Sequence, residues 1–459
     1  MKRAAILAAV LLPIAAAVLW EFAPGLDLAL ARLAGRASPS APTTILVVID
    51  TLRADRTSLC GYGKPTTPAL QRFASEGATF TCGARTPGSW TLPSHASFFT
   101  GLPVLEHGAH ELVSGGLTPE ATAERVRPLP KGVPTLAEAM AARGHQAHAV
   151  SANPVVSGAT GLARGFDTAV AAASFGELRG EALIDEVERA LRQRADERPL
   201  FLFVNVADAH PPFETIPASL GFLPPTKRLL YEPHRKKGNW RRFYAGTHRN
   251  AEKFLADVGH LYDYGVWRAD RTVAALVDRV EATGWCDRGC RWVVVSDHGE
   301  FLGEKGLVDH GHYLWEPDTR VPMMVWEKGT GASAPALPPL VNALHAYHLA
   351  KDGALPAELA PVVSVTWPHE RRCANTRKKF YCETSAALWE GDDKLLWTDG
   401  RFARYDLAAD PAEERPLPLD PDARARLDAL AAAVVAARSG SDAMDPELLE
   451  ALEAAGYLE

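Results

Sequence analysis

The feature that most constrains the fold of this chain is a series of short apolar runs rich in β-branched residues. The first covers residues 44–50, and similar runs recur at 146–151, 200–206, 291–296 and 321–326. A run that is apolar along its whole length predicts a strand buried on both faces, which is typical of a parallel sheet.

Helical patterns lie between these runs, for instance at 135–143 and 269–283. The alternation predicts an α/β fold, a doubly wound and mostly parallel sheet flanked by helices. Ligands of such sheets bind beyond the carboxyl ends of the strands. Asp50, Asp208 and Asp297 stand at or just past such ends, so we expect a functional site there.

The pattern changes after residue 354. Strand-like pieces at 362–365, 379–384, 394–398 and 401–405 precede a helical pattern at 421–438. They predict a smaller C-terminal α+β subdomain over residues 355–440, a short antiparallel sheet plus one helix. Residues 441–459 are expected to form a tail helix.

The N-terminus is typical of a targeting segment. Lys2 and Arg3 precede an uncharged apolar run from Ala4 to Trp20. That run is at the lower limit of about 17 residues for a membrane span and longer than most signal-peptide cores. We expect residues 1–43 to be a signal peptide or membrane anchor plus a linker; a buried core helix is the alternative. The chain would then be exported, and be periplasmic, secreted or anchored to the membrane.

The six cysteines fit an oxidising compartment. Closeness in sequence favours three disulfides, Cys60–Cys82, Cys286–Cys290 and Cys373–Cys382. Free thiols are the alternative. A zinc site at Cys286 and Cys290 lacks a second pair of ligands beside it.

The net charge of −7 gives no reason to expect a nucleic-acid partner. Residues 221–254 nevertheless form a basic segment interleaved with aromatic residues. Such a segment could hold an anionic substrate or lie on an anionic membrane surface. It could equally be a solvated surface excursion.

Three motifs carry the candidate chemistry. Asp50 ends the first strand, Asp297 and His298 follow a later one, and Thr91 stands two residues before Pro93. A proline fits the first turn of a helix, so Thr91 should lie at a helix start, where backbone N–H groups attract anions. Carboxylate and imidazole ligands suit zinc or manganese better than calcium. Each residue taken alone could be an ordinary cap or turn residue.

In this order and spacing the motifs resemble the sulfatase family of the alkaline phosphatase superfamily, over roughly residues 44–415. The resemblance implies a catalytic domain over 44–354 and a metal site formed by Asp50, Thr91, Asp297 and His298. Sulfatases place at position 91 a Cys or Ser that is oxidised to formylglycine, and an Arg at position 95. This chain has Thr91 and His95 there, Thr51 where a second Asp is common, and no Lys in residues 148–153.

The resemblance also implies roles for further residues. His210 and His312 would protonate the leaving oxygen or stabilise charge in the transition state. Ser94 and His95 could bind non-bridging oxygens. Substrate contacts are also expected from the neighbourhood of two further residues, Lys305 and His310. One divalent metal ion is expected, zinc or manganese by preference and otherwise calcium or magnesium. A second ion could bind Asp208 together with His210 and His312.

Threonine cannot become formylglycine, so we expect a metal-dependent enzyme in which Thr91 is the nucleophile. The preferred reaction is hydrolysis of a phosphate mono- or diester, or transfer of a phospho-group. One alternative is a sulfuric ester hydrolase with an unmodified threonine. The other is a catalytically inactive binding protein that retains the fold.

Overall fold

The structure is a computed structural model and describes residues 41–111, 126–192, 198–227, 239–244, 246–311, 313–367 and 383–437. The predicted N-terminal segment, the tail helix and the pair Cys373–Cys382 lie outside these ranges, as does His312. None of the described helices is both long and apolar enough to cross a membrane.

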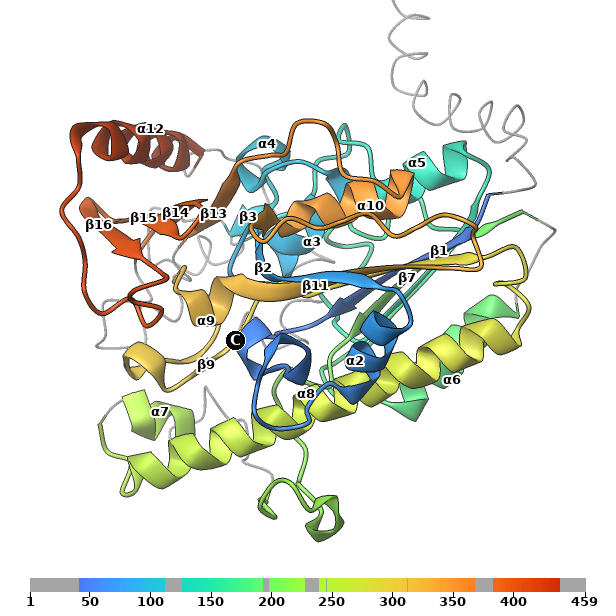
Figure 1. Ribbon diagram of the computed structural model, residues 1–459, viewed down its shortest axis with the longest axis horizontal. Helices are drawn as coiled ribbons and strands as arrows, with labels where there is room; N and C mark the ends of the chain where they lie inside the picture. The colour runs from blue at the N-terminus through green and yellow to red at the C-terminus, as the bar shows by residue number, and fades with distance from the viewer. Residues whose placement is uncertain are drawn as a thin grey trace, which may run out of the picture.

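The predicted α/β fold is confirmed. Eight strands form one sheet in the order β12-β2-β11-β8-β1-β7-β5-β6, in which β8, β1, β7, β5 and β6 are parallel and β11 is antiparallel to both of its neighbours (Figure 1). Their bounds are β1 Thr43–Ile49, β2 Thr79–Arg85, β5 Gln146–Ser151, β6 Thr168–Ala171, β7 Leu200–Val206, β8 Cys290–Val295, β11 Arg320–Lys328 and β12 Val341–Asn342.

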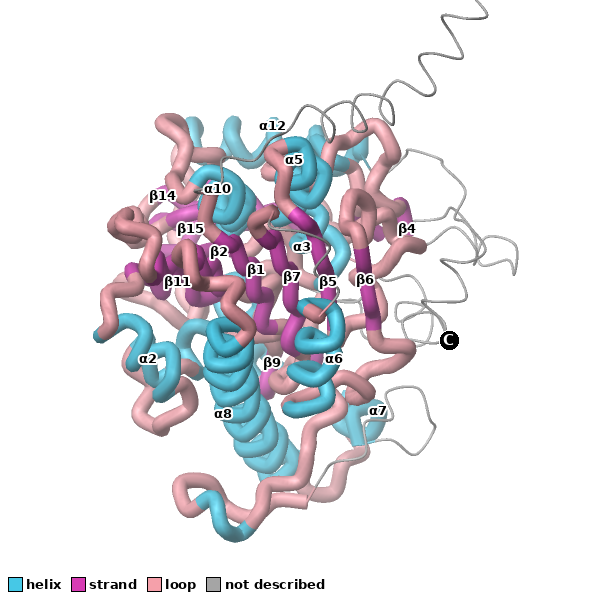
Figure 2. The backbone as a smooth tube through the Cα atoms, turned by 90° about the vertical axis from the view of Figure 1, so that its right-hand side faces the viewer, coloured by secondary structure: helices cyan, strands magenta, loops and turns pink. Residues whose placement is uncertain are grey.

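Helices cover both faces of this sheet, as Figure 2 shows. One apolar core lies under α2 (Pro68–Ser75), α6 (Glu181–Leu191) and α8 (Ala251–Ala282). The other lies under α3 (Thr91–Thr100), α5 (Leu136–Ala142) and α10 (Ala346–Asp352). Every residue of β1 and β7 is buried, which explains why both strands read as continuous apolar runs.

The C-terminal antiparallel sheet is also present. It comprises β13 (Val362–Thr366), β14 (Ser385–Glu390), β15 (Asp393–Thr398) and β16 (Arg401–Asp406), and α12 (Pro421–Ala437) covers it. Of the strand expected at 379–384, residues 379–382 lie outside the described ranges, and residues 383 and 384 are not in a strand, because the pairing with β15 begins at Ser385.

A buried network of four charges joins the two sheets. Arg85 of β2 pairs with Glu316 of α9 (Glu316–Thr319) at 2.6 Å, and Lys394 of β15 pairs with Glu413 at 2.5 Å. Lys394 is fully buried and also lies 3.5 Å from Glu316, while the indole N–H of Trp389 donates to Glu316. Two cations and two carboxylates therefore balance one another where the sheets meet.

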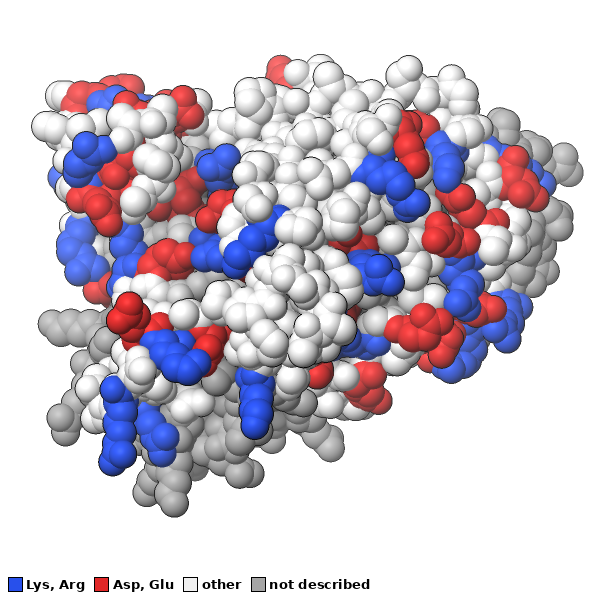
Figure 3. All heavy atoms as spheres, turned by 60° about the horizontal axis from the view of Figure 1, so that its bottom comes forward, with Lys and Arg blue, Asp and Glu red and all other residues white. Residues whose placement is uncertain are grey.

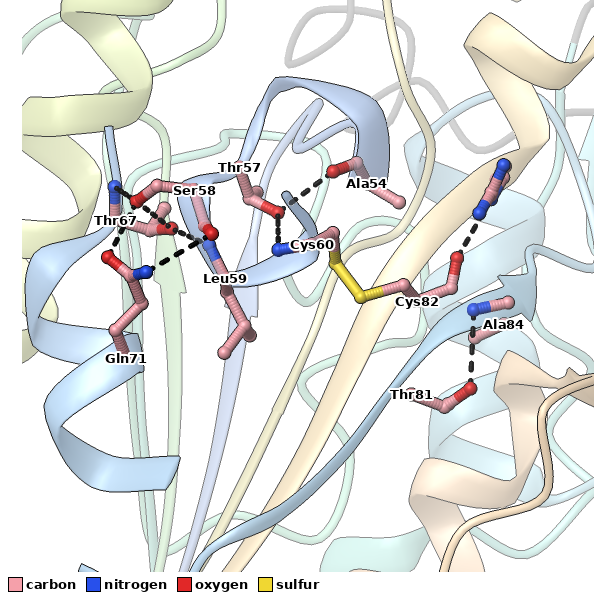
Figure 4. The surroundings of a disulfide bond; sticks show 12 residues. Ala54, Thr57, Ser58, Leu59, Cys60, Thr67, Gln71, Thr81, Cys82 and Ala84 are labelled. Atoms are coloured by element: carbon pink, nitrogen blue, oxygen red, sulfur yellow. Dashed lines mark hydrogen bonds between the residues drawn. A yellow bond between two sulfur atoms is a disulfide. The ribbon is translucent and has the colours of Figure 1, made fainter. Parts of the chain in front are cut away.

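Two of the predicted disulfides are confirmed. Cys60 is bonded to Cys82, which ties the loop after β1 to β2 (Figure 4). Cys286 is bonded to Cys290 at the start of β8. The loop that carries Cys60 is held by local hydrogen bonds as well, because the hydroxyl of Thr57 donates to the carbonyl of Ala54.

Two glycines allow the backbone to close around the carboxyl ends of the strands. A Cβ atom on Gly299 would lie 2.0 Å from the carbonyl oxygen of Pro317. A Cβ atom on Gly265, in the middle of α8, would lie 2.7 Å from the carbonyl oxygen of Asp208. Real side chains cannot approach backbone so closely, so only glycine fits at either position.

The basic segment predicted at 221–254 is only partly described, since residues 228–238 and 245 lie outside the described ranges. On the face of the molecule shown in Figure 3, acidic and basic side chains are interspersed on the left and right sides, and uncharged side chains occupy the upper middle.

Candidate active site

Three buried ligand atoms converge at the carboxyl ends of β1 and β8. The Oδ1 atom of Asp50, the Oδ2 atom of Asp297 and the Nε2 atom of His298 lie within 4.8 Å of one another. The imidazole nitrogen is 3.6 Å from Asp50 and 3.4 Å from Asp297. All three residues are fully buried, and none of these three atoms has a hydrogen-bond partner within the described part of the chain.

The remaining polar atoms of these side chains are held in place. Asp297 Oδ1 accepts the N–H groups of Thr51 and His298, at 3.2 and 3.0 Å. His298 Nδ1 lies 2.9 Å from the carbonyl oxygen of Gly299. A carbonyl only accepts, so Nδ1 carries the proton, and Nε2 turns a bare lone pair toward the carboxylates, as in a metal-binding histidine.

The turn after β1 is strained and well supported. Thr51 is a β-branched residue at φ 60°, a conformation that costs about 1–3 kcal/mol. The N–H of Thr51 donates a hydrogen bond to Asp297, and the carbonyl of Thr51 accepts a hydrogen bond of 2.6 Å from the hydroxyl of Tyr262. The same tyrosine accepts the N–H of Arg53 at 2.9 Å. Strain here is offset by contacts that fix Asp50 relative to Asp297.

The electrostatics favour a bound cation. Burial raises the pKa of the Asp50 carboxyl, and burial together with the neighbouring Asp50 raises the pKa of Asp297 well above its usual range. Burial lowers the pKa of His298 well below its usual range. A divalent cation would compensate the two carboxylates, and the carboxylate–imidazole donor set fits zinc or manganese. The residues present therefore fit the expected metal.

Thr91 begins α3, next to these ligands. Trp90 is the N-cap residue, and the Oγ1 atom of Thr91 accepts a hydrogen bond of 2.9 Å from Nδ2 of Asn153. The same amide donates to Asp50 Oδ2 at 2.7 Å, whereas Asn205 approaches that oxygen only to 3.4 Å. Asn153 thus connects the candidate nucleophile with a candidate metal ligand.

Sequence reasoning noticed Asn153 only as part of a stretch that lacks lysine. Its position just past the buried strand β5 is the signal that could have identified it, since the same position marks Asp50 and Asp297. The side chain is fully buried, and its Oδ1 accepts the N–H of Val155 at 2.9 Å. That bond orients the NH₂ group toward the site.

Ser94 and His95 lie behind Thr91 on the first turn of α3. The hydroxyl of Ser94 donates to the carbonyl of Gly88 at 3.3 Å. Nδ1 of His95 lies 3.0 Å from the carbonyl of Thr91 and 3.5 Å from Asp297 Oδ2. Burial lowers the pKa of His95 to about 3, so this imidazole is neutral at pH 7. In this arrangement the side chains of Ser94 and His95 stabilise the first turn of α3 through contacts with backbone carbonyl groups.

Two other histidines border the site. The His310 ring lies 4.3 Å from that of His298 and 5.1 Å from that of His210, measured between centroids. His210 stacks on Phe175 at 4.1 Å. Nδ1 of His310 lies 3.0 Å from a carboxylate oxygen of Glu300. His310, expected only as a substrate contact, therefore lies beside the candidate metal ligand His298.

A second buried group of possible ligands adjoins the first. Glu300, Asp309 and His310 offer ligand atoms within 4.8 Å of one another. Asp208, the residue expected to join a second metal, instead pairs with Arg268 at 3.0 Å and accepts the hydroxyl of Thr272 at 3.2 Å. Its carboxylate is thus engaged outside the two ligand groups.

Lys305 does not lie among the ligands. Its ammonium donates to the carbonyl oxygen of Glu413 at 2.7 Å and lies 4.8 Å from the ring centroid of Trp315. A buried cation that sequence reasoning missed, Arg179, donates to the carbonyl of His210 at 2.8 Å and so fixes that segment.

The chain is similar in sequence to one family model and in fold to several solved structures. A family model described as Sulfatase matches residues 42–348. Among solved structures, a phosphonate monoester hydrolase of Agrobacterium radiobacter is similar with a TM-score of 0.62 at 16% identity, over 87% of this chain and 96% of that one. A 2-O GAG sulfatase is similar with a TM-score of 0.59 at 16% identity, over 89% and 96%. No curated protein matches the chain by sequence.

Proposed function

The chain belongs to the sulfatase family, and we propose that it is a metal-dependent enzyme that cleaves phosphate esters with Thr91 as nucleophile. The observation that supports this proposal is the convergence of three unpartnered ligand atoms beside the Thr91 hydroxyl. Asp50, Asp297 and His298 would hold the ion, with Thr91 beside them. A divalent cation bound there supplies positive charge that lowers the pKa of the hydroxyl and attracts the ester anion.

The residues of the chain then account for both halves of a double displacement. Thr91 Oγ1 would give its proton to water and form a bond to phosphorus while the bond from phosphorus to the ester oxygen breaks. Asn153 holds Oγ1 in one orientation through its N–H group. His310, with His210 beside it, would donate a proton to the departing alkoxide, so that the alcohol leaves neutral.

In the second half, water would attack the phosphothreonine and give a proton to His310, Oγ1 would leave and regain its proton from solvent, and phosphate (a phosphate monoester, from a diester substrate) would be released. An acceptor alcohol in place of water would make the enzyme a phosphotransferase. Glu300 accepts a hydrogen bond from Nδ1 of His310 and so orients this ring in both steps. Backbone N–H groups at the start of α3 would attract the incoming anion.

The test compares a phosphodiester, a phosphomonoester and a sulfate ester of one chromogenic alcohol. We expect the wild type to hydrolyse a phosphate ester fastest, Thr91→Ala to lose activity by at least about 1,000-fold, and Thr91→Ser to retain part of it. Thr100→Ala, at the other end of the same helix, is the matched control and should be unaffected. Equal activity of Thr91→Ala and wild type would remove Thr91 from the mechanism.

The same preparation separates the alternatives. Faster sulfate-ester hydrolysis that depends on Thr91 would make the chain a sulfatase with an unmodified threonine. An inactive binding protein should contain no stoichiometric transition metal after purification. We expect one metal ion per chain that is lost in Asp297→Asn, measured by elemental analysis of the purified proteins.

A further inference from the structure

The segment that leads into the candidate nucleophile is buried along its whole length. Residues 86–90 connect β2 to Thr91 at the start of α3, and every one of them is buried. The candidate metal ligands stand elsewhere, at the ends of β1 and β8. The path of residues 86–90 therefore decides where the Thr91 hydroxyl lies relative to those ligands.

The edge strand of the C-terminal sheet lies against this segment. In Figure 1 β13 is the strand of that sheet nearest the large sheet. One edge of β13 pairs with β14, and on the other Val365 forms a parallel bridge with Gly88. The N–H of Val365 donates to the carbonyl of Pro87 at 3.1 Å, and the hydroxyl of Ser364 donates to the carbonyl of Thr86. The C-terminal sheet thus holds the backbone that precedes the nucleophile.

A contact between two side chains completes this junction. The hydroxyl of Ser89, two residues before Thr91, donates to the hydroxyl of Thr366 at 2.7 Å. Ser89 is fully buried, and Thr366 at the end of β13 is only 2% exposed. Removing the Thr366 hydroxyl would leave the Ser89 hydroxyl buried without its acceptor, which is unfavourable enough to shift the segment.

Gly88 transmits such a shift to the first turn of α3. A Cβ atom on Gly88 would lie 2.7 Å from Cγ of Pro93, so the backbone already touches the proline ring. The carbonyl of Gly88 also accepts the hydroxyl of Ser94 at 3.3 Å. Because packed interiors yield little, a displacement of Gly88 away from β13 is passed on to the turn that carries Thr91.

We propose that Ser89 and Thr366 are a pair of positioning residues, through which the C-terminal sheet holds the Thr91 hydroxyl in line with the bond that breaks. The pair acts through Gly88 and the first turn of α3. In-line attack depends on the position of the nucleophile, and a misplacement of about 1 Å lowers the rate by about 100-fold. The inference rests on the proposed function, since it assigns the pair a part in the reaction of Thr91.

The same sheet supplies a matched control for the kinetic test. The hydroxyls of Ser385 and Thr398, on β14 and β15, form a buried pair at 3.1 Å. Thr366→Val and Thr398→Val each remove one hydroxyl from this sheet, and Thr366 is the one that accepts a bond from Ser89.

We expect Thr366→Val to lower kcat for a phosphate ester by about 10- to 100-fold and to leave KM within about 3-fold. Thr398→Val should leave both within about 2-fold. Thr366→Ser keeps the hydroxyl and should restore kcat to within about 3-fold of wild type.

Further measurements distinguish positioning from a loss of stability. The melting temperature and the zinc affinity of Thr366→Val should equal those of Thr398→Val, because the metal ligands are unchanged. Ser89→Ala/Thr366→Val should be no slower than the slower single variant, since both changes remove one contact. Hydrogen exchange of the peptide 86–95, followed by mass spectrometry, should be faster in Thr366→Val than in Thr398→Val, and this measurement needs no turnover.

The outcomes separate the positioning role from the proposed reaction. A kcat of Thr366→Val within about 2-fold of wild type, or equal losses in Thr366→Val and Thr398→Val, overturns the positioning role even if Thr91 proves to be the nucleophile. Unchanged exchange of the peptide 86–95 in Thr366→Val overturns it as well. A wild type that hydrolyses no ester refutes the proposed reaction, and faster exchange confined to Thr366→Val then still supports the hold of the C-terminal sheet on this segment.

Discussion

The double hydrogen bond made by Asn153 leads to a quantitative prediction for the variant Asn153→Ala. The bond of 2.7 Å to Asp50 is a hydrogen bond to a charged group, worth about 1.5–3 kcal/mol. Asp50 would keep only the contact of 3.4 Å from Asn205 on the same oxygen. The loss corresponds to a weakening of metal affinity by about 10- to 100-fold, the range found for groups that orient metal ligands.

The assay is a competition for zinc between the protein and a chromophoric chelator at fixed pH. Asn205→Ala is the matched control, because its longer contact with the same oxygen should contribute less. Thermal unfolding of both metal-free variants shows whether loss of the Val155 bond has disturbed the loop. An affinity within about 2-fold of wild type for Asn153→Ala, or a larger effect of Asn205→Ala, would refute this account of how Asp50 is held.

Three further predictions concern stability. Lys394→Met should lower the free energy of unfolding by about 3–5 kcal/mol in urea titrations, because Glu413 would keep a buried charge without its cation; Lys394→Met/Glu413→Gln should recover part of the loss. Removing the disulfide with Cys60→Ser/Cys82→Ser should lower the free energy of unfolding by about 3 kcal/mol at 25 °C, as expected for a sequence separation of 22. A melting temperature equal to that of the wild type under oxidising conditions would contradict this. The third concerns acid. Burial lowers the pKa of His107 to about 3, so below its ordinary pKa of about 6.5 only the unfolded chain takes up this proton and stability falls as the pH drops. His107→Gln should lose less stability than wild type between pH 6.5 and 5, and parallel losses would show that His107 does not contribute.

The central strands could be located from the sequence because a strand buried on both faces is apolar along its whole length. The bounds predicted for β5 and β7 agree with the structure. By contrast β2, with the sequence TFTCGAR, was missed because its residues are only partly buried toward its start and include a glycine. The helix α8 was predicted only from residue 269, although it begins at Ala251, since its first turns carry many polar side chains.

Site residues that belong to short sequence motifs could be predicted. Residues whose position in the site depends on contacts between separate segments of the chain could not. Asp50, Thr91, Asp297 and His298 come together as expected. The contacts of Asn153 and Glu300 could not be inferred from spacing, because both side chains form hydrogen bonds to residues of other segments of the chain. His312 lies outside the described residues, so its expected role stays a prediction.

Gly265 shows how far the demands of the site reach into the scaffold. A glycine in the middle of a helix costs about 1 kcal/mol relative to alanine, so exchange for alanine is ordinarily a way to make a protein more robust. In α8 the backbone beside Asp208 occupies the space that a methyl group would need. Replacing Gly265 by alanine to raise the thermal stability of the protein would therefore displace the segment that carries His210. The helix must keep a residue of low helix propensity at this position.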